Sequence, residues 1–260
     1  MEILDELKKD SIKSLISSGK RAGDRDNVTY RDMVIKKNVL GYSEGSAVVR
    51  LGKSQVLCAV KIGMGTPFPD RQDEGMLATS AELMPMASYL FEPGPPSTEA
   101  VELARIVDRG IRAAEMIDMK KLYIDEGKVL AIYIDLYVMD HDGNLIDAAG
   151  AAAMAALQCT KMPKIKNGEI VKGEYKGQLE LSKTVTTHTF AKIGDTLLLD
   201  PCLDEEKGME ARVTLEIMDN DSICAIQKWG TGSFTQEELE KVMDIAFKKS
   251  KDIKKRITKA

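Results

Sequence analysis

The sequence predicts an α+β protein of two similar halves, because strand-like segments followed by a helix-like segment occur twice along the chain. The composition agrees, since 43% of the 260 residues are hydrophobic and 30% are charged, enough to build a substantial core. This balance excludes an intrinsically disordered chain. The net charge of −4 gives no indication of a nucleic-acid-binding protein.

The chain begins with a helix, in which apolar residues recur at helical spacing until Gly19, a residue that commonly ends helices. Four strands are expected next, over residues 30–40, 46–51, 55–62 and 77–84. The second and third form a hairpin around a tight turn at Gly52 and Lys53.

A central helix is expected from Ser97, a good N-cap residue, to about Lys121. Its core-facing stripe comprises Val101, Ala104, Val107, Ile111 and Ala114. The nearly continuous apolar run at 129–139 predicts a strand covered on both sides. Residues 147–157 are almost all Ala and Gly, which predicts a helix that lies very close to its neighbours.

The second half is expected to follow Asn167-Gly168, with strands over 185–193, 196–199, 212–218 and 223–227. Thr235 and Glu238 form a capping box for the final helix. Its core side comprises Leu239, Val242, Ala246, Ile253 and Ile257. We therefore divide the chain into an N-terminal helix and arm (1–28), a first half (29–165) and a second half with the C-terminal helix (166–260).

The C-terminal segment is basic, since residues 248–260 hold seven Lys or Arg and one acid. Two interpretations stay open. Cationic side chains suit the negative end of a helix dipole, and they also suit contact with a nucleic acid.

Three arginines form a stripe on the central helix. Arg105, Arg109 and Arg112 are spaced four and three apart, so they share one face, offset from the apolar stripe. Because planar guanidinium groups fit phosphate oxygens, this arginine stripe is a candidate phosphate-binding site. Local ion pairing is the alternative, because Glu102 precedes Arg105 by three residues and Asp108 precedes Arg112 by four.

Two further polar segments are weaker candidates. Carboxylates cluster after Asp200-Pro201, namely Asp204, Glu205, Glu206 and Glu210. They could bind Mg²⁺ or form a solvated turn. His141, between Asp140 and Asp142, could serve acid–base chemistry, but a turn is the simpler interpretation. We expect no metal site and no cofactor.

Four widely spaced cysteines without a CxxC pair argue against a zinc site and a disulfide framework, which favours a reducing, cytoplasmic location. No apolar run approaches the roughly 20 residues of a membrane span, so no membrane partner is expected. Only 5% of residues are aromatic, which argues against an RNA-binding sheet that stacks several bases.

Several segments carry a family resemblance that extends from about Gly19 to the last helix. They are EGSA at 44–47, LGKSQV at 51–56, FEPGPP at 91–96, ELARIVDRGIR at 102–112 and DGNLIDAA at 142–149. Together they resemble the ribonuclease PH superfamily, and within it the larger ring subunits of the archaeal exosome. The resemblance implies two βαβα-type halves and a hexameric ring of three heterodimers with a catalytic ribonuclease PH-like subunit. It also implies RNA-binding cap proteins and a channel for single-stranded RNA, which is degraded from its 3′ end with phosphate as nucleophile.

The resemblance further implies that this chain is not itself catalytic. Active relatives carry a Gly-Ser/Thr-Arg loop where this chain has Asp142-Gly143-Asn144, and a carboxylate there would repel phosphate. They also carry two aspartates where this chain has Glu206 and Arg212. We therefore expect a structural and RNA-binding subunit without catalytic residues.

Under this resemblance, the central helix faces the RNA path, which favours contact between RNA and the stripe of Arg105, Arg109 and Arg112. Two alternatives stay open. One is an enzyme in its own right, with Mg²⁺ held by Asp204, Glu205 and Glu206. The other is a pure scaffold whose arginines form only ion pairs.

Overall fold

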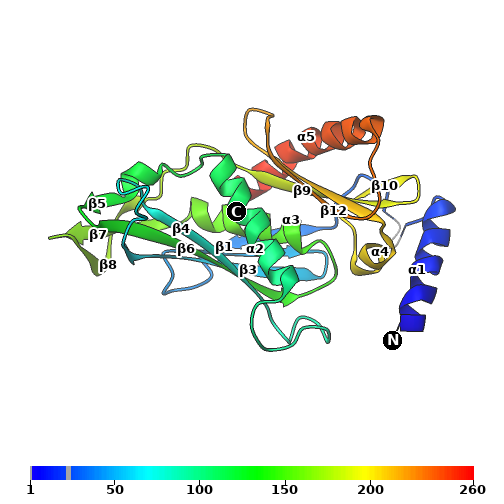
Figure 1. The fold of residues 1–260 in the computed structure, drawn as a ribbon, viewed down its shortest axis with the longest axis horizontal. Coiled ribbons are helices and arrows are strands. Elements are labelled where there is room, and N and C mark those ends of the chain that lie inside the picture. Colours follow the sequence, from blue (N-terminus) through cyan, green and yellow to red (C-terminus); the bar gives the residue numbers. More distant parts are fainter. Residues whose placement is uncertain (1, 22–24) are drawn as a thin grey trace.

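The computed structural model describes residues 2–21 and 25–260, with side chains from residue 9 onward within these ranges. The expected strands and helices are present, with additional elements between them (Figure 1). The helices are α1 (Glu2–Ser17), α2 (Thr98–Ala113), α3 (Leu145–Gln158), α4 (Leu203–Gly208), α5 (Gln236–Lys259) and the 3₁₀ turn η1 (Met119–Leu122).

The first half forms one sheet. Its strands are β1 (Met33–Lys37), β2 (Gly45–Leu51), β3 (Ser54–Gly65), β4 (Met76–Leu83), β5 (Tyr123–Asp125) and β6 (Lys128–Asp140). They are arranged in the order β1-β2-β3-β6-β4, with β5 paired to β6. Only β4 and β6 run parallel among these pairs, because α2 lies between them in the chain and returns it to the same end of the sheet.

The second half forms another sheet from β9 (Thr186–Ile193), β10 (Thr196–Leu199), β11 (Ala211–Ile217) and β12 (Ile223–Gly230). The order is β10-β9-β11-β12, antiparallel throughout, so β12 is an edge strand. In chain order, each half thus consists of strands, a helix, further strands and a second helix. This order confirms the expected two βαβα-type halves.

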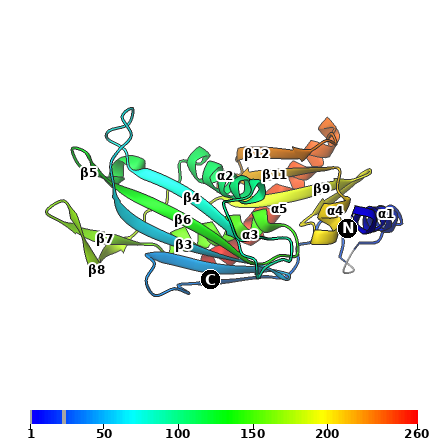
Figure 2. The ribbon, with the colours of Figure 1, turned by 60° about the horizontal axis from the view of Figure 1, so that its bottom comes forward.

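Helices α2 and α3 lie at the junction of the two sheets (Figures 1 and 2). Helix α2 packs against β4 and β12, and α3 packs against β2, β3 and β9, so each helix contacts both sheets. Helix α5 also bridges the halves, because Val242 and Ala246 join the core of the second sheet while Ile253 and Ile257 join that of the first.

Small residues allow this close packing, as the sequence predicts. Residues 146–149 and 151–157 of α3 are all buried. A Cβ added at Gly150 would lie 2.3 Å from Oγ1 of Thr187 on β9, and one added at Gly110 of α2 would lie 2.2 Å from Oε1 of Glu216 on β11. The missing side chains at Gly150 and Gly110 therefore leave room for Thr187 and for the Glu216 carboxyl group next to α3 and α2.

Several local expectations are wrong. Helix α2 ends at Ala113 rather than near Lys121, because Glu115 adopts a positive φ of 50°. Val101 is 46% exposed and so lies outside the buried face of α2, which includes Ala100 and Leu103 instead. The 129–139 strand is covered on both sides only at its start, since Tyr133 is 40% exposed and burial alternates beyond it.

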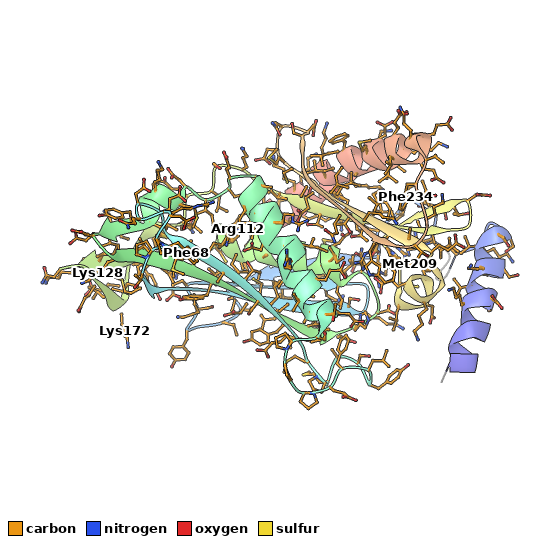
Figure 3. All side chains as sticks on the ribbon, in the orientation of Figure 1. Phe68, Arg112, Lys128, Lys172, Met209 and Phe234 are labelled. Atoms are coloured by element: carbon orange, nitrogen blue, oxygen red, sulfur yellow. The ribbon has the colours of Figure 1, made fainter. Side chains whose placement is uncertain are left out.

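Four elements have no counterpart among the expected strands and helices, namely β5, β7, β8 and α4. A hairpin of β7 (Lys161–Lys166) and β8 (Glu169–Gln178) projects at one end of the molecule, near the labelled Lys128 and Lys172 (Figure 3). Asn167-Gly168 is the turn of this hairpin rather than a boundary between the sheets. The acidic residues 204–206 lie in the short helix α4.

Candidate functional site

Acidic residues on both sides of Pro201 pair with arginines near the start of the chain. Arg21 donates to Glu205 with Nε–Oε1 at 2.8 Å, and both side chains are nearly inaccessible. Arg31 forms a second such pair with Asp200, with Nη2–Oδ1 at 2.8 Å. Glu205 is thus committed to an internal ion pair, whereas its neighbour Asp204 is exposed.

Asn144 connects the two halves at the N-terminus of α3. It adopts the left-handed conformation with φ of 50°, and its side chain donates to Asp147 at 2.9 Å and to Asp200 at 2.8 Å. Its backbone N–H donates to Oε1 of Glu206 at 2.8 Å. Since exposed N–H groups at a helix N-terminus form a natural anion site, Glu206 provides the anion from within the chain.

Glu206 and Arg212, the two positions at which the family resemblance predicts a departure from the aspartates of active relatives, lie in one electrostatic environment. Burial raises the pKa of Glu206 to about 7, while Arg212 and Arg31 act in the opposite direction. Arg212 in turn donates to Glu102 of α2, with Nη2–Oε1 at 2.8 Å. Charged side chains therefore connect the start of α3 to α2, through Glu206, Arg212 and Glu102.

A buried network lies behind this site. Asp147 accepts hydrogen bonds from the hydroxyls of Tyr30 at 2.8 Å and Thr189 at 2.7 Å, and burial raises the pKa of Asp147 to about 6. The Tyr30 hydroxyl also lies 2.9 Å from Nδ1 of His188, whose pKa burial lowers to about 3. These residues come from both halves, so the network fixes their relative position.

The turn around His141 packs against two other loops. The His141 ring stacks on Phe91 with centroids 5.3 Å apart, and burial lowers the pKa of His141. Gly143 packs against the backbone of Cys202. The turn thereby joins the loop before α2 to the loop before α4.

All three residues of the arginine stripe are exposed on α2, as expected, but their contacts differ. Arg112, labelled in Figure 3, pairs with Asp108 at 2.7 Å and donates to the carbonyl of Leu77. Arg109 donates to Oε1 of Gln227 at 3.2 Å. Arg105 has neither a hydrogen bond nor an ion pair within residues 9–21 and 25–260, the part whose side chains are described.

The local-pairing alternative is therefore confirmed for Arg112 and wrong for Arg105. Glu102 pairs with Arg212 from the second half instead of with Arg105, its neighbour on the helix. Sequence spacing could not reveal this contact, because the two partners lie 110 positions apart.

A groove of about 320 Å³ lies between α2 and the edge strand β12. Its lining comprises Thr98, Val101, Glu102, Arg105, Ile106, Arg109, Gln227 and Trp229. The sequence interpretation missed Gln227 and Trp229. Their signal was present, since residues two apart on a strand share a face.

In the described ranges, no group of three or more His, Cys, Asp or Glu side chains is arranged to hold a metal ion. The described part of the chain also holds no helix that is long and apolar enough to cross a membrane.

Comparisons with known proteins agree with this fold. Residues 29–163 match domain 1 of the 3′ exoribonuclease family, and residues 183–249 match its domain 2. A protein of Thermococcus onnurineus named exosome complex component Rrp42 is 44% identical over 100% of this chain and 97% of its own length. Its namesake in Methanothermobacter thermautotrophicus is 43% identical over 96% of this chain and 93% of its own.

Among solved structures, a chain of the Archaeoglobus fulgidus exosome with RNA bound to the active site superimposes with a TM-score of 0.89. It is 35% identical, and the match covers 98% of this chain and 99% of that one. A chain of an archaeal exosome core gives a TM-score of 0.87 at 32% identity, with 98% of each chain covered.

Proposed function

Because this chain belongs to the 3′ exoribonuclease family, we propose that it is a non-catalytic, RNA-binding ring subunit of an archaeal-type exosome. In this proposal it alternates with a catalytic ribonuclease PH-like partner in a hexamer of three heterodimers. The complex degrades single-stranded RNA from the 3′ end with phosphate as nucleophile, carries RNA-binding cap proteins and works in the cytoplasm.

The observation that carries the proposal is the hydrogen bond from the backbone N–H of Asn144 to the Glu206 carboxylate. An attacking phosphate needs an anion pocket, and a helix N-terminus is well suited to provide one. Here the Glu206 carboxyl group already accepts from that position, and Asp142 on the same turn pairs with Arg31. Phosphate binding at this place would have to displace Glu206 and would bring a second anion close to Asp142.

The charge of Arg212, the second of the two positions at which active relatives carry an aspartate, supports the same conclusion. Phosphorolysis needs acids that hold a metal or donate a proton to the leaving group. Arg212 is a permanent cation, and its guanidinium is bound to Glu102. Glu205, the central acid of the Mg²⁺ alternative, is paired with Arg21 inside the protein.

The arginine stripe supports the RNA-binding part of the proposal. Among the residues whose side chains are described, neither Arg105 nor Arg109 forms an ion pair with an acid, and both line the groove beside β12. Exposed guanidinium groups bind the phosphates of any RNA sequence, which suits a subunit that guides substrate without reading it. Arg112 is held by Asp108, so we assign it the smallest share of RNA binding.

Activity assays test the catalytic part. The purified chain should not shorten a labelled RNA in phosphate buffer, and the mixture with a catalytic partner should. Phosphate-dependent release of nucleoside diphosphates by the chain alone would overturn the proposal.

Binding assays test the RNA part. Arg105→Ala with Arg109→Ala should weaken binding of a single-stranded RNA to the assembled ring and lower the salt dependence of binding by up to about one unit of slope per residue. Arg50→Ala, an exposed arginine of the first sheet, is the control. Arg109→Ala with Arg112→Ala addresses the scaffold alternative. Loss of the hexamer with unchanged RNA affinity would assign these side chains to a subunit interface.

A further inference from the structure

Trp229 is the single tryptophan of the chain, and it is 47% exposed on the edge strand β12. It lies opposite Arg212 in the register of β11 and β12, and the Arg212 guanidinium lies 5.6 Å from the centre of its ring. Residues 212 and 229 are on the sheet face that meets α2, so the indole forms one wall of the groove.

The opposite wall of the groove is cationic. Arg105 and Arg109 project from α2 beside Trp229, and the one acid of the lining, Glu102, is neutralised by Arg212. Thr98 and Gln227 add polar side chains to the lining, and Val101 and Ile106 add apolar ones. An aromatic ring between guanidinium groups matches a ligand with a flat π-face and negative charges on either side.

A nucleotide within a single strand has this chemistry. We propose that the groove binds one base of single-stranded RNA, stacked on Trp229, with the adjoining phosphates on Arg105 and Arg109. The proposal rests on the RNA-binding function above and adds a base contact to it. Since every base offers a π-face, the contact tolerates any sequence, while a volume of about 320 Å³ restricts it to a single nucleotide.

The experiment compares two labelled oligonucleotides of equal length and charge, oligoadenylate and a strand without bases, by fluorescence anisotropy on the assembled ring. Trp229→Leu should weaken oligoadenylate binding by roughly tenfold and leave the abasic strand unaffected, because stacking contributes on this scale per base. Trp229→Phe, which keeps an aromatic face, should retain most of the affinity. Thermal unfolding of each variant and the mass of the ring control for folding and assembly.

The outcomes separate the two proposals. Equal affinities of wild type and Trp229→Leu for oligoadenylate would overturn stacking, and RNA binding by the arginines would stand if Arg105→Ala with Arg109→Ala still weakens both strands. If neither the arginine nor the Trp229 variants alter binding of either strand, the RNA-binding function itself fails. If Trp229→Leu dissociates the ring while Trp229→Phe does not, the groove holds a partner subunit and the base-binding proposal is wrong.

Discussion

The backbone of Gly143 lies directly against that of Cys202, so that an added Cβ would stand 2.4 Å from the carbonyl carbon of Cys202. Gly143 also has a positive φ of 83°, a conformation that favours glycine. This contact joins the turn that precedes α3 to the loop that precedes α4, and thus the first half to the second.

Gly143→Ala should therefore destabilise the chain by about 2–5 kcal/mol, the sum of the backbone clash and the unfavourable φ. Gly194→Ala is the matched control, because Gly194 also has a positive φ but nothing lies within 4 Å of an added Cβ. Its cost should be about 1–2 kcal/mol. Urea unfolding measures both, and equal losses would show that the Cys202 backbone simply yields.

The buried pair of Arg31 and Asp200 should be far more important for stability than an exposed pair. Arg31→Ala leaves the fully buried Asp200 without its main partner, which should cost about 3–5 kcal/mol. Arg50→Ala removes a pair with Asp32 at 4.0 Å, both of whose side chains are more than half exposed, so its cost should be near zero. Thermal unfolding that shifted equally in both variants would contradict this ranking.

Stability should fall as pH rises toward 8, because of Glu216. Burial raises its pKa from 4.5 to about 8, with Arg109 acting against the shift and Asp147 in favour of it. The folded chain thus keeps a proton that the unfolded chain has released, and the free energy of unfolding decreases with rising pH across this range. Above the pKa of Glu216 in the folded chain, the carboxyl group is deprotonated in both states, and the free energy of unfolding decreases no further on its account.

Glu216→Gln should reduce this slope between pH 6.5 and 8 by up to about 1.4 kcal/mol per pH unit. A residual slope should stay, because burial also raises the pKa of Glu206, to about 7. Glu82→Gln, on the exposed side of β4, controls for the change in net charge. Urea unfolding at four pH values gives the slopes, and an unchanged slope in Glu216→Gln would be inconsistent with a buried, protonated carboxyl.

Glu206→Ala distinguishes a subunit that supports catalysis from one that performs it. The assembled ring should keep its phosphorolysis rate within about twofold, because the proposed function assigns the reacting groups to the partner. Asp244→Ala, an exposed acid on α5 outside the Mg²⁺ alternative, is the matched control. A loss of activity in Glu206→Ala at unchanged thermal stability would instead place a catalytic acid on this chain.

Elements with strong local signals were predictable. The capping box of Thr235 and Glu238 and the tight turn after Leu51 both form as expected, because each depends on residues within four positions of one another. The end of α2 was not predictable, since its apolar pattern continues through Ala114 although the backbone turns at Glu115. Hairpin β7–β8 lacks a buried face, so it left no alternation of apolar residues to recognise.

The site was predictable only in part. Spacing placed the three arginines on one exposed face, but the partner of Glu102 comes from β11 and the partner of Glu205 from the N-terminal arm. Such contacts depend on how the halves dock, which no local pattern records. The low aromatic content also gave no indication of a base-binding site at Trp229, although a single exposed ring is sufficient to bind one base.

Noncovalent contacts within the chain hold the two walls of the groove, α2 and the second sheet, in a fixed relative position. The Arg212–Glu102 ion pair and the Arg109–Gln227 hydrogen bond both connect the helix to the second sheet. Arg105 and Trp229 are therefore carried by a preorganised frame, and the loss of conformational entropy on binding falls mainly on the incoming strand. A flexible RNA strand loses this entropy one nucleotide at a time, as each nucleotide enters the groove. Such a groove would therefore bind RNA tightly enough to orient it and weakly enough to let it move forward.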